Sequence, residues 1–263
     1  MTPAILTDLT KCIGCLACAS ACKEINGLPV DDGAGELSAT TWAAVETRAG
    51  VHIRRQCMHC LDPACVSVCP VGALQKTEEG PVIYDAARCI GCRYCMIGCP
   101  FGMPKYEWDN PLPKVQKCIM CYQKRLSEGK EPACTAACPT GATIFGDRDE
   151  LIHEAQHRID DHPDRYVDHV YGLEEAGGTS VLYLAGQPFE TLGFNTGIQG
   201  DPYPALTWAI LNKVPNVVTL GGVLMCGFWW LTNRKNEITR IEVEASHSPE
   251  TESDTTQNGG GES

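Results

Sequence analysis

Sixteen of the 17 cysteines of this 263-residue chain lie between residues 12 and 138, and they form four compact blocks. The blocks are Cys12, Cys15, Cys18, Cys22; Cys57, Cys60, Cys65, Cys69; Cys89, Cys92, Cys95, Cys99; and Cys118, Cys121, Cys134, Cys138. The segment around them has few long apolar runs and little helical periodicity. A chain so poor in core side chains needs inorganic groups to hold its fold. The cysteines are therefore expected to be metal ligands.

The spacing within the blocks identifies the metal group. In two-cluster ferredoxins, C-x2-C-x2-C supplies three ligands of one [4Fe–4S] cluster, and a fourth cysteine before a proline ligates the other cluster. The third block has this pattern complete, and the first has it with Lys23 in place of the proline. The second block widens one gap to four residues, and the fourth carries twelve residues between Cys121 and Cys134. The pattern predicts [4Fe–4S] clusters.

Two other kinds of cysteine-rich protein fit this spacing less well. A zinc-stapled structural protein would need only two separated cysteine pairs for each tetrahedral site. A disulfide-stapled one would not repeat loops whose neighbouring cysteines cannot easily pair. Every set of three cysteines here has a fourth to complete it, which favours electron transfer over substrate binding at an open iron. The sequence contains no G-x-G-x-x-G fingerprint and no P-loop, so we expect a subunit without catalytic residues of its own.

An internal repeat indicates the fold. ILTDLTKCIGC, ending at Cys15, matches VIYDAARCIGC, ending at Cys92, and CPVGAL after the second block resembles CPTGATI after the fourth. We predict an α+β fold of duplicated two-[4Fe–4S] ferredoxin-like modules, rich in loops, with one C-terminal transmembrane helix. His59 lies between two ligands and is expected to support the cluster without binding it. Gly14 and Gly91 are expected to let backbone N–H groups approach the sulfurs.

The chain divides into four predicted regions. These are a four-cluster ferredoxin-like domain at 1–146, an irregular α/β extension at 147–205, a transmembrane helix at 206–233 and an acidic disordered tail at 234–263. The extension contains a predicted helix at 147–156 and a predicted strand at 177–185. Its histidines lack metal-site spacing and are expected to be solvated surface residues; they are His153, His157, His162 and His169.

The membrane helix is predicted from length and flanks. Residues 217–231, VVTLGGVLMCGFWWL, are uninterrupted but short, and extension back to Leu206 across a break at residues 212–216 reaches the usual span of about 20 residues. Trp208, Trp229 and Trp230 occupy the expected interfacial positions. A buried core helix was the alternative, and the polar segment that follows the apolar run argues against it. Cys226 is expected to pack as a small apolar residue.

Charge restricts the partners and the localisation. The formal net charge is −12, which argues against nucleic acid as a partner. No signal peptide is visible at the start of the sequence. Arg234 and Lys235 follow the helix, which predicts a cytoplasmic C-terminus and a periplasmic cluster domain in the cell inner membrane. Lys213 on the other flank of the helix weakens this prediction.

The runs RRQCMHCLDPACVSVCPVGAL at 54–74 and CIGCRYCMIGCPFGMPKYEWDNP at 89–111 resemble the four-cluster ferredoxin subunits of respiratory enzyme complexes. The family includes β subunits of membrane-bound formate dehydrogenases, partners of molybdopterin reductases and the anchored iron–sulfur subunit of hydrogenase-2-type [NiFe] hydrogenases. HVYGLEEAGGTSVLYLAGQPFETLGF at 169–194 and the single C-terminal helix make the hydrogenase type the closer resemblance. The resemblance implies electron transport in anaerobic respiration, between a catalytic subunit and a membrane cytochrome b or quinone-site subunit. A formate dehydrogenase or other molybdopterin enzyme is the alternative partner.

The resemblance also implies how the ligands are shared, with the first block paired with the fourth and the second with the third. Four clusters follow, named here by their ligands: cluster A, Cys12, Cys15, Cys18, Cys138; cluster B, Cys118, Cys121, Cys134, Cys22; cluster C, Cys57, Cys60, Cys65, Cys99; and cluster D, Cys89, Cys92, Cys95, Cys69. Formate dehydrogenase β subunits also lack a signal and are exported folded with a signal-bearing partner, and the same route is expected here.

Overall fold

The computed structural model describes residues 2–30 and 35–246, and these residues fall into two units, divided between Trp208 and Ala209. Within the first unit a three-stranded sheet places β1 (Pro3–Asp8) between β8 (Thr143–Asp147) and β9 (Val181–Leu184). β1 runs antiparallel to β8 and parallel to β9. The first strand of the chain therefore lies between two strands that follow the last cysteine block.

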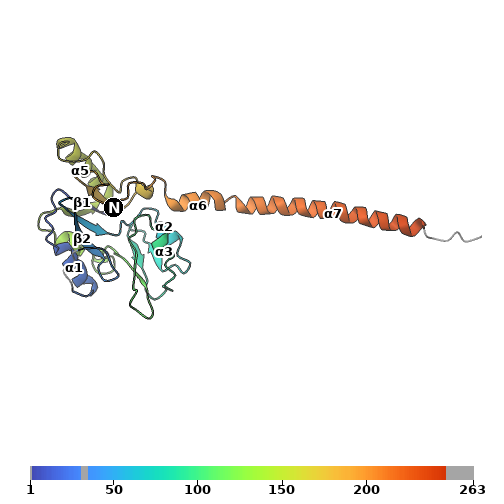
Figure 1. Cartoon of the computed structure of the whole chain (residues 1–263), viewed down its shortest axis with the longest axis horizontal. Coiled ribbons are helices and arrows are strands. Elements are labelled where there is room, and N and C mark those ends of the chain that lie inside the picture. Colours follow the sequence, from blue (N-terminus) through green and yellow to red (C-terminus); the bar gives the residue numbers. More distant parts are fainter. Residues whose placement is uncertain (1, 31–34, 247–263) are drawn as a thin grey trace, which may run out of the picture. The chain divides into compact units, whose positions relative to one another are not determined.

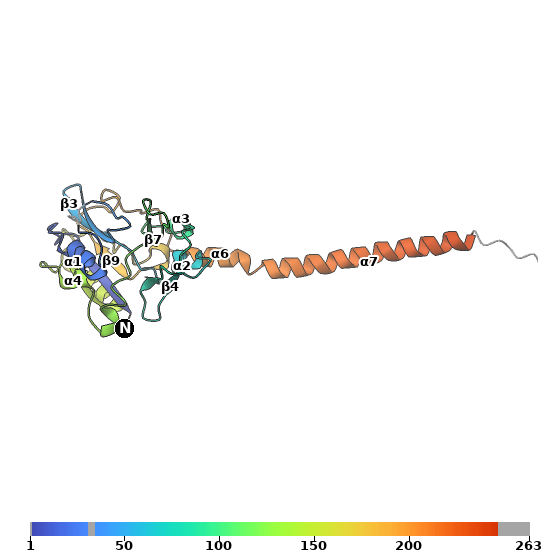
Figure 2. The same ribbon diagram turned by 90° about the horizontal axis from the view of Figure 1, so that it is seen from below.

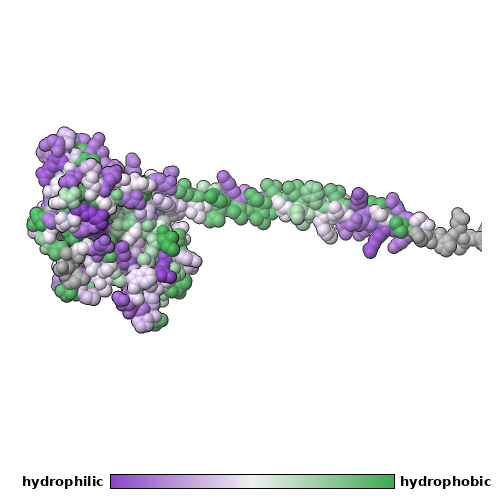
Figure 3. Space-filling model, in the orientation of Figure 1, coloured by the Kyte–Doolittle hydropathy of each residue, from purple (hydrophilic) through white to green (hydrophobic). Residues whose placement is uncertain are grey.

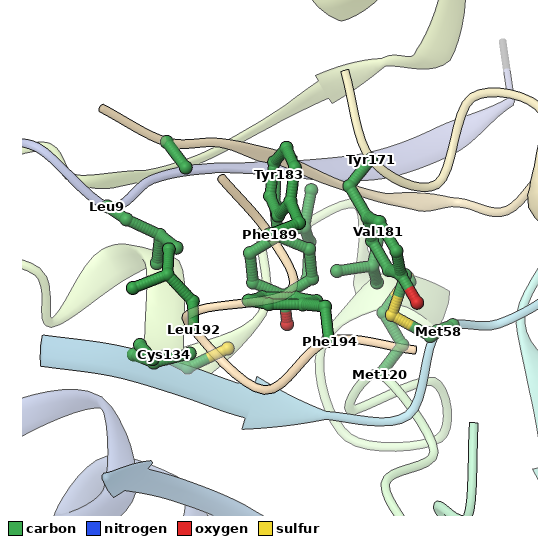
Figure 4. Close-up of a cluster of buried hydrophobic side chains, with 13 residues drawn as sticks. Leu9, Met58, Met120, Cys134, Tyr171, Val181, Tyr183, Phe189, Leu192 and Phe194 are labelled. Carbon is green, nitrogen blue, oxygen red and sulfur yellow. The ribbon is translucent and has the colours of Figure 1, made fainter. Parts of the chain in front are cut away.

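Each face of this sheet carries its own core, as alternation along a strand requires. Leu6 and Leu184 face α5 (Arg148–Asp161) and pack with its Leu151 and Ile159. On the opposite face, Ile5 of β1 and Val181 and Tyr183 of β9 belong to a second core (Figure 4). This second core is rich in rings and comprises Leu9, Ile53, Met58, Met120, Cys134, Tyr171, Val181, Tyr183, Ala185, Phe189, Leu192 and Phe194, together with Ile5. The long segment after α5 thus closes over the cysteine-bearing region.

Three small hairpins complete the strands of this unit. β2 (Ala43–Arg48) pairs with β3 (Val51–Gln56), β4 (Leu74–Lys76) with β5 (Val82–Tyr84), and β6 (Lys105–Tyr106) with β7 (Val115–Gln116). A third core of Leu74, Val82 and Val115, with Cys65 and Cys95, lies beneath the two shorter hairpins. Two 3-10 turns occur at Leu126–Glu128 and Glu175–Gly177.

The helices near the cysteines form two pairs. α1 (Ala17–Asn26) packs against α4 (Ala133–Ala136), and the two lie together in Figure 2. α2 (Ala64–Ser67) packs against α3 (Tyr94–Ile97), as seen in Figure 1. The first pair joins the first and fourth cysteine blocks, and the second pair joins the second and third. The duplicated ferredoxin-like architecture predicted from the repeat is thus reproduced in the packing.

Two helices lie at the C-terminal end of the described residues. α6 (Tyr203–Leu211) and α7 (Val214–Ser246) are separated at Asn212 and Lys213, where the sequence predicts a break. Within the described residues, one helical segment, Tyr203–Ser246, is long and apolar enough to cross a membrane. Figure 3 shows hydrophobic surface along α6 and the first part of α7, and hydrophilic surface further along α7. The described side chains of α7 are all exposed.

The structure differs from the predicted boundaries at two points. Residues 147–205 do not form a separate extension, because β9 pairs with β1 and α5 packs on the same sheet. Residues 234–246, expected in a disordered tail, continue α7, since RKNEITRIEVEAS contains several good helix formers and no proline. The remainder of the predicted tail, 247–263, lies outside the described residues. The predicted helix at 147–156 is confirmed and extended to Asp161.

Candidate metal centres

The four thiols predicted for cluster A surround one cavity. Cys12, Cys15, Cys18 and Cys138 line it, together with Arg54. The first three come from the loop between β1 and α1 and from α1 itself, whereas Cys138 follows α4. The contact between α1 and α4 therefore brings a residue 120 positions away in the chain to Cys18.

The thiols predicted for cluster D surround a second cavity of the same kind. Cys69, Cys89, Cys92 and Cys95 line it, and Tyr84 lies beside them. Cys69 follows α2, and Cys95 lies in α3, so the packing of these two short helices again joins two blocks. The cavity has the ligand set that the resemblance implies for cluster D.

The thiols predicted for cluster B are all buried. Cys22 and Cys134 each interact electrostatically with the other three thiols of the set. Burial raises the pKa of Cys22 to about 12, and the neighbouring Cys134 and Cys121 add to the shift. Burial raises the pKa of Cys118 as well, with Cys22 the next contributor. Such thiols release their protons to solvent readily only when a cationic group, such as a bound metal centre, stabilises the thiolate in place of the lost hydration.

The thiols predicted for cluster C form a fourth neighbourhood. Burial raises the pKa of Cys60 well above the usual thiol value, followed by the charges of Cys57, Cys99 and Cys65. Cys99 comes from the third block and the others from the second. The structure thus brings the cysteines of each predicted set near one another, and their binding of clusters stays a prediction.

Three electrostatic interactions between thiols of different sets connect these neighbourhoods in a series. The pKa of Cys18 is raised by burial and, among the nearby thiols, most by Cys134, which links A to B. The pKa of Cys118 is raised most by burial, next by Cys22 and then by Cys57, and this last interaction links B to C. Burial raises the pKa of Cys65 to about 12, and Cys95 contributes to the shift, which links C to D. The four groups of ligands, called sets or sites A to D after the clusters predicted for them, therefore follow the order A, B, C, D.

The ligand loops share a left-handed turn before the second cysteine. The residue preceding that cysteine has φ +69° at Gly14, +70° at Gly91, +48° at His59 and +55° at Met120. The repeat explains glycine at the first two positions. His59 and Met120 are non-glycine residues in the same conformation, which costs energy and is typical of functional loops.

Hydrogen bonds to sulfur follow from these turns. The backbone N–H of Gly91 donates to Cys89 Sγ at 3.4 Å, and that of Met120 donates to Cys118 Sγ at 3.3 Å. Although burial raises the pKa of Cys89, the Tyr84 hydroxyl and the N–H groups of Val115 and Gly91 bring it below its usual value. Donors of this kind stabilise negative charge on sulfur, which suits a thiolate ligand.

The buried polar atoms near the cysteines also fit a sulfur-rich group. Among the described residues no hydrogen-bond partner is found for Nε and Nη1 of Arg54, Nε2 of Gln56 or Nε2 of His59. His59 Nδ1 accepts from the N–H of Val82 at 3.0 Å, so its unpaired Nε2 carries the proton. Buried donors without partners are costly unless a ligand accepts from them. Cluster sulfurs are acceptors of the required kind.

The 17 cysteines form no disulfide with one another. In the described part of the chain no three His, Cys, Asp or Glu side chains are arranged to hold a single metal ion. Two of the predicted sets of four, those of clusters A and D, line a shared cavity. This arrangement fits the larger [4Fe–4S] group.

Three cationic residues near the cysteines were not predicted from the sequence. Arg54 is buried beside site A. Lys117 is buried, and its Nζ donates to Val82 O at 2.6 Å and to Cys118 O at 2.8 Å. Lys23 donates to Thr40 O at 3.0 Å and to Thr41 Oγ1 at 2.9 Å. Lys23 replaces the expected proline because α1 continues through it to Asn26, and proline would interrupt that helix. The alternation of HIRRQ in β3 could have indicated the position of Arg54, because it places Arg54 on the same face as His52 and Gln56.

The predicted histidines reach the surface of the segment after β8, and one of them, His169 with 41% of its side chain exposed, also contacts a buried carboxylate. His169 Nε2 lies 2.7 Å from Glu175 Oε1, and Glu175 Oε2 accepts from the N–H of Gly172 at 2.6 Å. His169 therefore helps to hold a buried carboxylate in the turn before β9.

Comparison with known proteins assigns the chain to a class. Models of the 4Fe-4S dicluster domain match residues 11–73 and 49–148, which together include all sixteen clustered cysteines. A protein of Nitratidesulfovibrio vulgaris strain Hildenborough is 41% identical over 255 residues, covering 90% of this chain and 69% of that protein. The class is therefore that of ferredoxin-type dicluster proteins.

Two further relatives narrow the class. Hydrogenase-2 operon protein HybA of Escherichia coli O157:H7 is 40% identical over 234 residues, 72% of this chain and 71% of HybA. The nitrate-inducible formate dehydrogenase iron-sulfur subunit of Escherichia coli K12 is 39% identical over 198 residues, 68% of this chain and 66% of the relative. The chain belongs to the family of iron–sulfur proteins that contains these two. The predicted family, fold class and function as an electron-transfer subunit of a respiratory oxidoreductase are confirmed.

Proposed function

We propose that this electron-transfer subunit holds four [4Fe–4S] clusters on ligand sets A to D and connects a hydrogenase catalytic subunit to a cytochrome b or quinone-reducing subunit in the membrane. The clusters, when bound, supply one-electron oxidation and reduction. The observation that carries the proposal is a series of neighbouring thiols, Cys18 with Cys134, Cys118 with Cys57, and Cys65 with Cys95. Packing supports the first and third pairs, since Cys18 packs against the core that contains Cys134, and Cys65 and Cys95 share a core.

The burial of the thiols supports this role for the two ends. Set B is wholly buried, whereas Cys15 in set A is exposed. An apolar side chain lies exposed beside each terminal site, Ile13 at A and Ile90 at D, with exposed fractions of 60% and 65%. Exposed apolar residues that border a redox site are suited to a protein partner. We propose that the two partners dock at these two ends.

The exit of the chain from the first unit suggests which end serves the membrane partner. Pro202 packs against Gly177, and the neighbouring Gly178 accepts a hydrogen bond from the N–H of Leu61. Leu61 follows Cys60, a ligand of set C. The apolar helical segment begins at Tyr203, directly after Pro202. We therefore assign the membrane acceptor to the end of the series that contains sets C and D. Site A then faces the catalytic subunit.

The proposed orientation puts the cluster domain in the periplasm and the end of α7 in the cytoplasm of a single-pass inner-membrane protein. Arg234, Lys235 and Arg240 on α7 support it, because basic residues flank membrane helices on the cytoplasmic side. Protease added to intact spheroplasts is expected to degrade the cluster domain. A domain protected until the membrane is lysed would overturn the orientation.

The partner is tested by purifying the intact complex through an affinity tag on this chain and measuring nickel and molybdenum. Nickel supports the hydrogenase partner, as the likeness to HybA suggests. Molybdenum or tungsten would replace it with the alternative, a formate dehydrogenase, as the likeness to the formate dehydrogenase subunit suggests.

Electron transfer through the chain is tested by comparing two acceptors in membranes. Cys57→Ala removes a ligand from the interior of the series. We expect hydrogen-dependent reduction of a soluble viologen, which takes electrons from the catalytic subunit directly, to continue. Hydrogen-dependent reduction of quinone should be lost. Quinone reduction at the wild-type rate in this variant would contradict the proposal.

A further inference from the structure

Arg54 is the largest of the fully buried side chains, with 1% of its surface exposed. It lies in β3, opposite Val45 of β2. Alternation along β3 places His52, Arg54 and Gln56 on one face, and Ile53, on the opposite face, joins the aromatic core. The His52 ring lies against Gly14 of the first ligand loop. The face that carries Arg54 is therefore the face toward site A.

The guanidinium group has donors that no protein atom uses. Its Nη2 donates to Gln56 Oε1 at 2.5 Å. Its Nε and Nη1 are buried and have no hydrogen-bond partner within residues 2–30 and 35–246. A buried guanidinium that lacks acceptors is strongly destabilising, so the fold must supply a compensating negative group.

The negative groups nearest to Arg54 belong to two ligand sets. Arg54 lowers the pKa of Cys12 and Cys18 in set A, in each case against a larger opposing effect of burial. It acts in the same sense on Cys22 and Cys121 in set B. Cys134 and Cys118 of set B are among the thiols that act on Arg54 in return. The guanidinium thus lies within electrostatic range of six of the eight thiols of sets A and B.

We propose that Arg54 is a shared cation of clusters A and B, whose Nε and Nη1 donate hydrogen bonds to cluster sulfur and whose charge raises the midpoint potentials of both clusters. The inference rests on the proposed binding of clusters by these sets. Arginine suits the place because its planar fork presents donors in several directions and its charge persists in a buried site.

The sign of the effect follows from charge. Reduction adds one electron to a cluster that already carries four thiolates, so the reduced form is the more negative. A fixed positive charge stabilises the reduced form more than the oxidised form and raises the potential. Sets C and D lie near other cations, Lys117 at Cys65 and Lys114 at Cys89. Removal of Arg54 should therefore affect two of the four clusters.

The test is a redox titration of the detergent-solubilised full chain followed by electron paramagnetic resonance, with iron measured on the same samples. In Arg54→Gln, two of the four midpoint potentials should become more negative, and the other two should stay unchanged. Arg54→Lys keeps the positive charge but loses the planar guanidinium donors, so it should give a smaller shift of the same two midpoint potentials. The matched control is Arg55→Lys, because Arg55 binds Glu46 and Leu192 O on the opposite face. The control should leave all four potentials unchanged.

The outcomes separate the inference from the proposed function. Variants that keep their iron with four unchanged potentials, or with all four shifted alike, would overturn the role of Arg54 and leave the clusters intact. Wild-type protein without iron would overturn the proposed function instead.

A second measurement needs no variant to load iron. Wild-type protein labelled with ¹⁵N in the guanidino groups of arginine should show ¹⁵N hyperfine coupling to a reduced cluster by pulsed resonance. The absence of such coupling would overturn the inference.

Discussion

The hydroxyl of Tyr166 donates a hydrogen bond to Asp8 Oδ2 at 2.8 Å, although 158 residues separate the two in the chain. Asp8 is fully buried and ends β1, four residues before the first ligand, Cys12. It also accepts from the Thr10 N–H at 3.0 Å, from Thr10 Oγ1 at 2.6 Å and from Arg158 Nη1 at 3.2 Å. One carboxylate thus fixes the start of the first ligand loop to the segment that follows β8.

Asp8→Ala should destabilise the first unit strongly. The substitution leaves the buried Tyr166 hydroxyl and the largely buried Arg158 without their acceptor, a change that typically costs about 3–5 kcal/mol. A lower apparent Tm of the full chain in detergent, followed by circular dichroism, checks this. Asp161→Ala is the control, because the ion pair of Asp161 with His157 is exposed on both sides. Equal Tm values for the two variants would contradict the role of Asp8.

The sharing of ligands between blocks predicts an unusual pattern of iron loss. Cys138→Ala should lower the iron content from about 16 to about 12 atoms per chain, because one four-iron cluster is lost. Adding Cys12→Ala should remove no more, since both residues line the cavity of set A. Adding Cys121→Ala instead should leave about 8 irons. If each block held its own cluster, the results of the two double variants would be exchanged.

Gly91 combines a left-handed backbone with a close neighbour. Its φ is +70°, and a Cβ at this position would lie 2.7 Å from the carbonyl oxygen of Pro113. Gly91→Ala should therefore displace the third ligand loop and lower both the Tm and the iron content. Gly129→Ala is the control, because Gly129 has φ +73° with no atom within 4 Å of a Cβ among the described residues. The backbone strain alone costs about 1–2 kcal/mol in both variants. An equal loss of Tm in the two would show that the contact with Pro113 has no effect.

The two exposed isoleucines should differ in the partner that they serve. Ile13→Glu places a charge beside site A and should weaken binding of the catalytic subunit. Ile90→Glu places a charge beside site D and should weaken coupling to the membrane acceptor. Co-purification of the catalytic subunit checks the first variant, and quinone reduction by a complex of normal composition checks the second. Loss of the catalytic subunit from Ile90→Glu but not from Ile13→Glu would reverse the assigned ends.

The cysteine pattern predicted the local structure well because the ligands of each block lie close together in the chain, from Cys12 to Cys22 in the first block and from Cys89 to Cys99 in the third. The turns at Gly14 and Gly91 and the break at Asn212 and Lys213 follow from glycine and from polar residues in an apolar run. The chain reveals these features without knowledge of distant contacts. The resemblance added the pairing of blocks, which agrees with the packing of α1 on α4 and of α2 on α3.

Long-range pairing could not be predicted in the same way. The parallel pairing of β9 with β1 joins Val181 to Ile5, and no local pattern specifies that partner. The burial of Arg54 was missed because an arginine in a strand is usually at the surface, and the compensating charge comes from cysteines elsewhere in the chain. His59 and Met120 adopt left-handed turns that their side chains disfavour, so the constraint on them comes from the ligand loop.

The most direct test of the central claim, that the sixteen clustered thiols hold four [4Fe–4S] clusters, combines iron and sulfide analysis with spin quantification of the anaerobically purified full chain. The account predicts about 16 irons and 16 acid-labile sulfides per chain, a brown absorbance that dithionite bleaches, and about four unpaired spins after full reduction. A colourless protein loaded with zinc, or one whose cysteines are oxidised to disulfides, would contradict it.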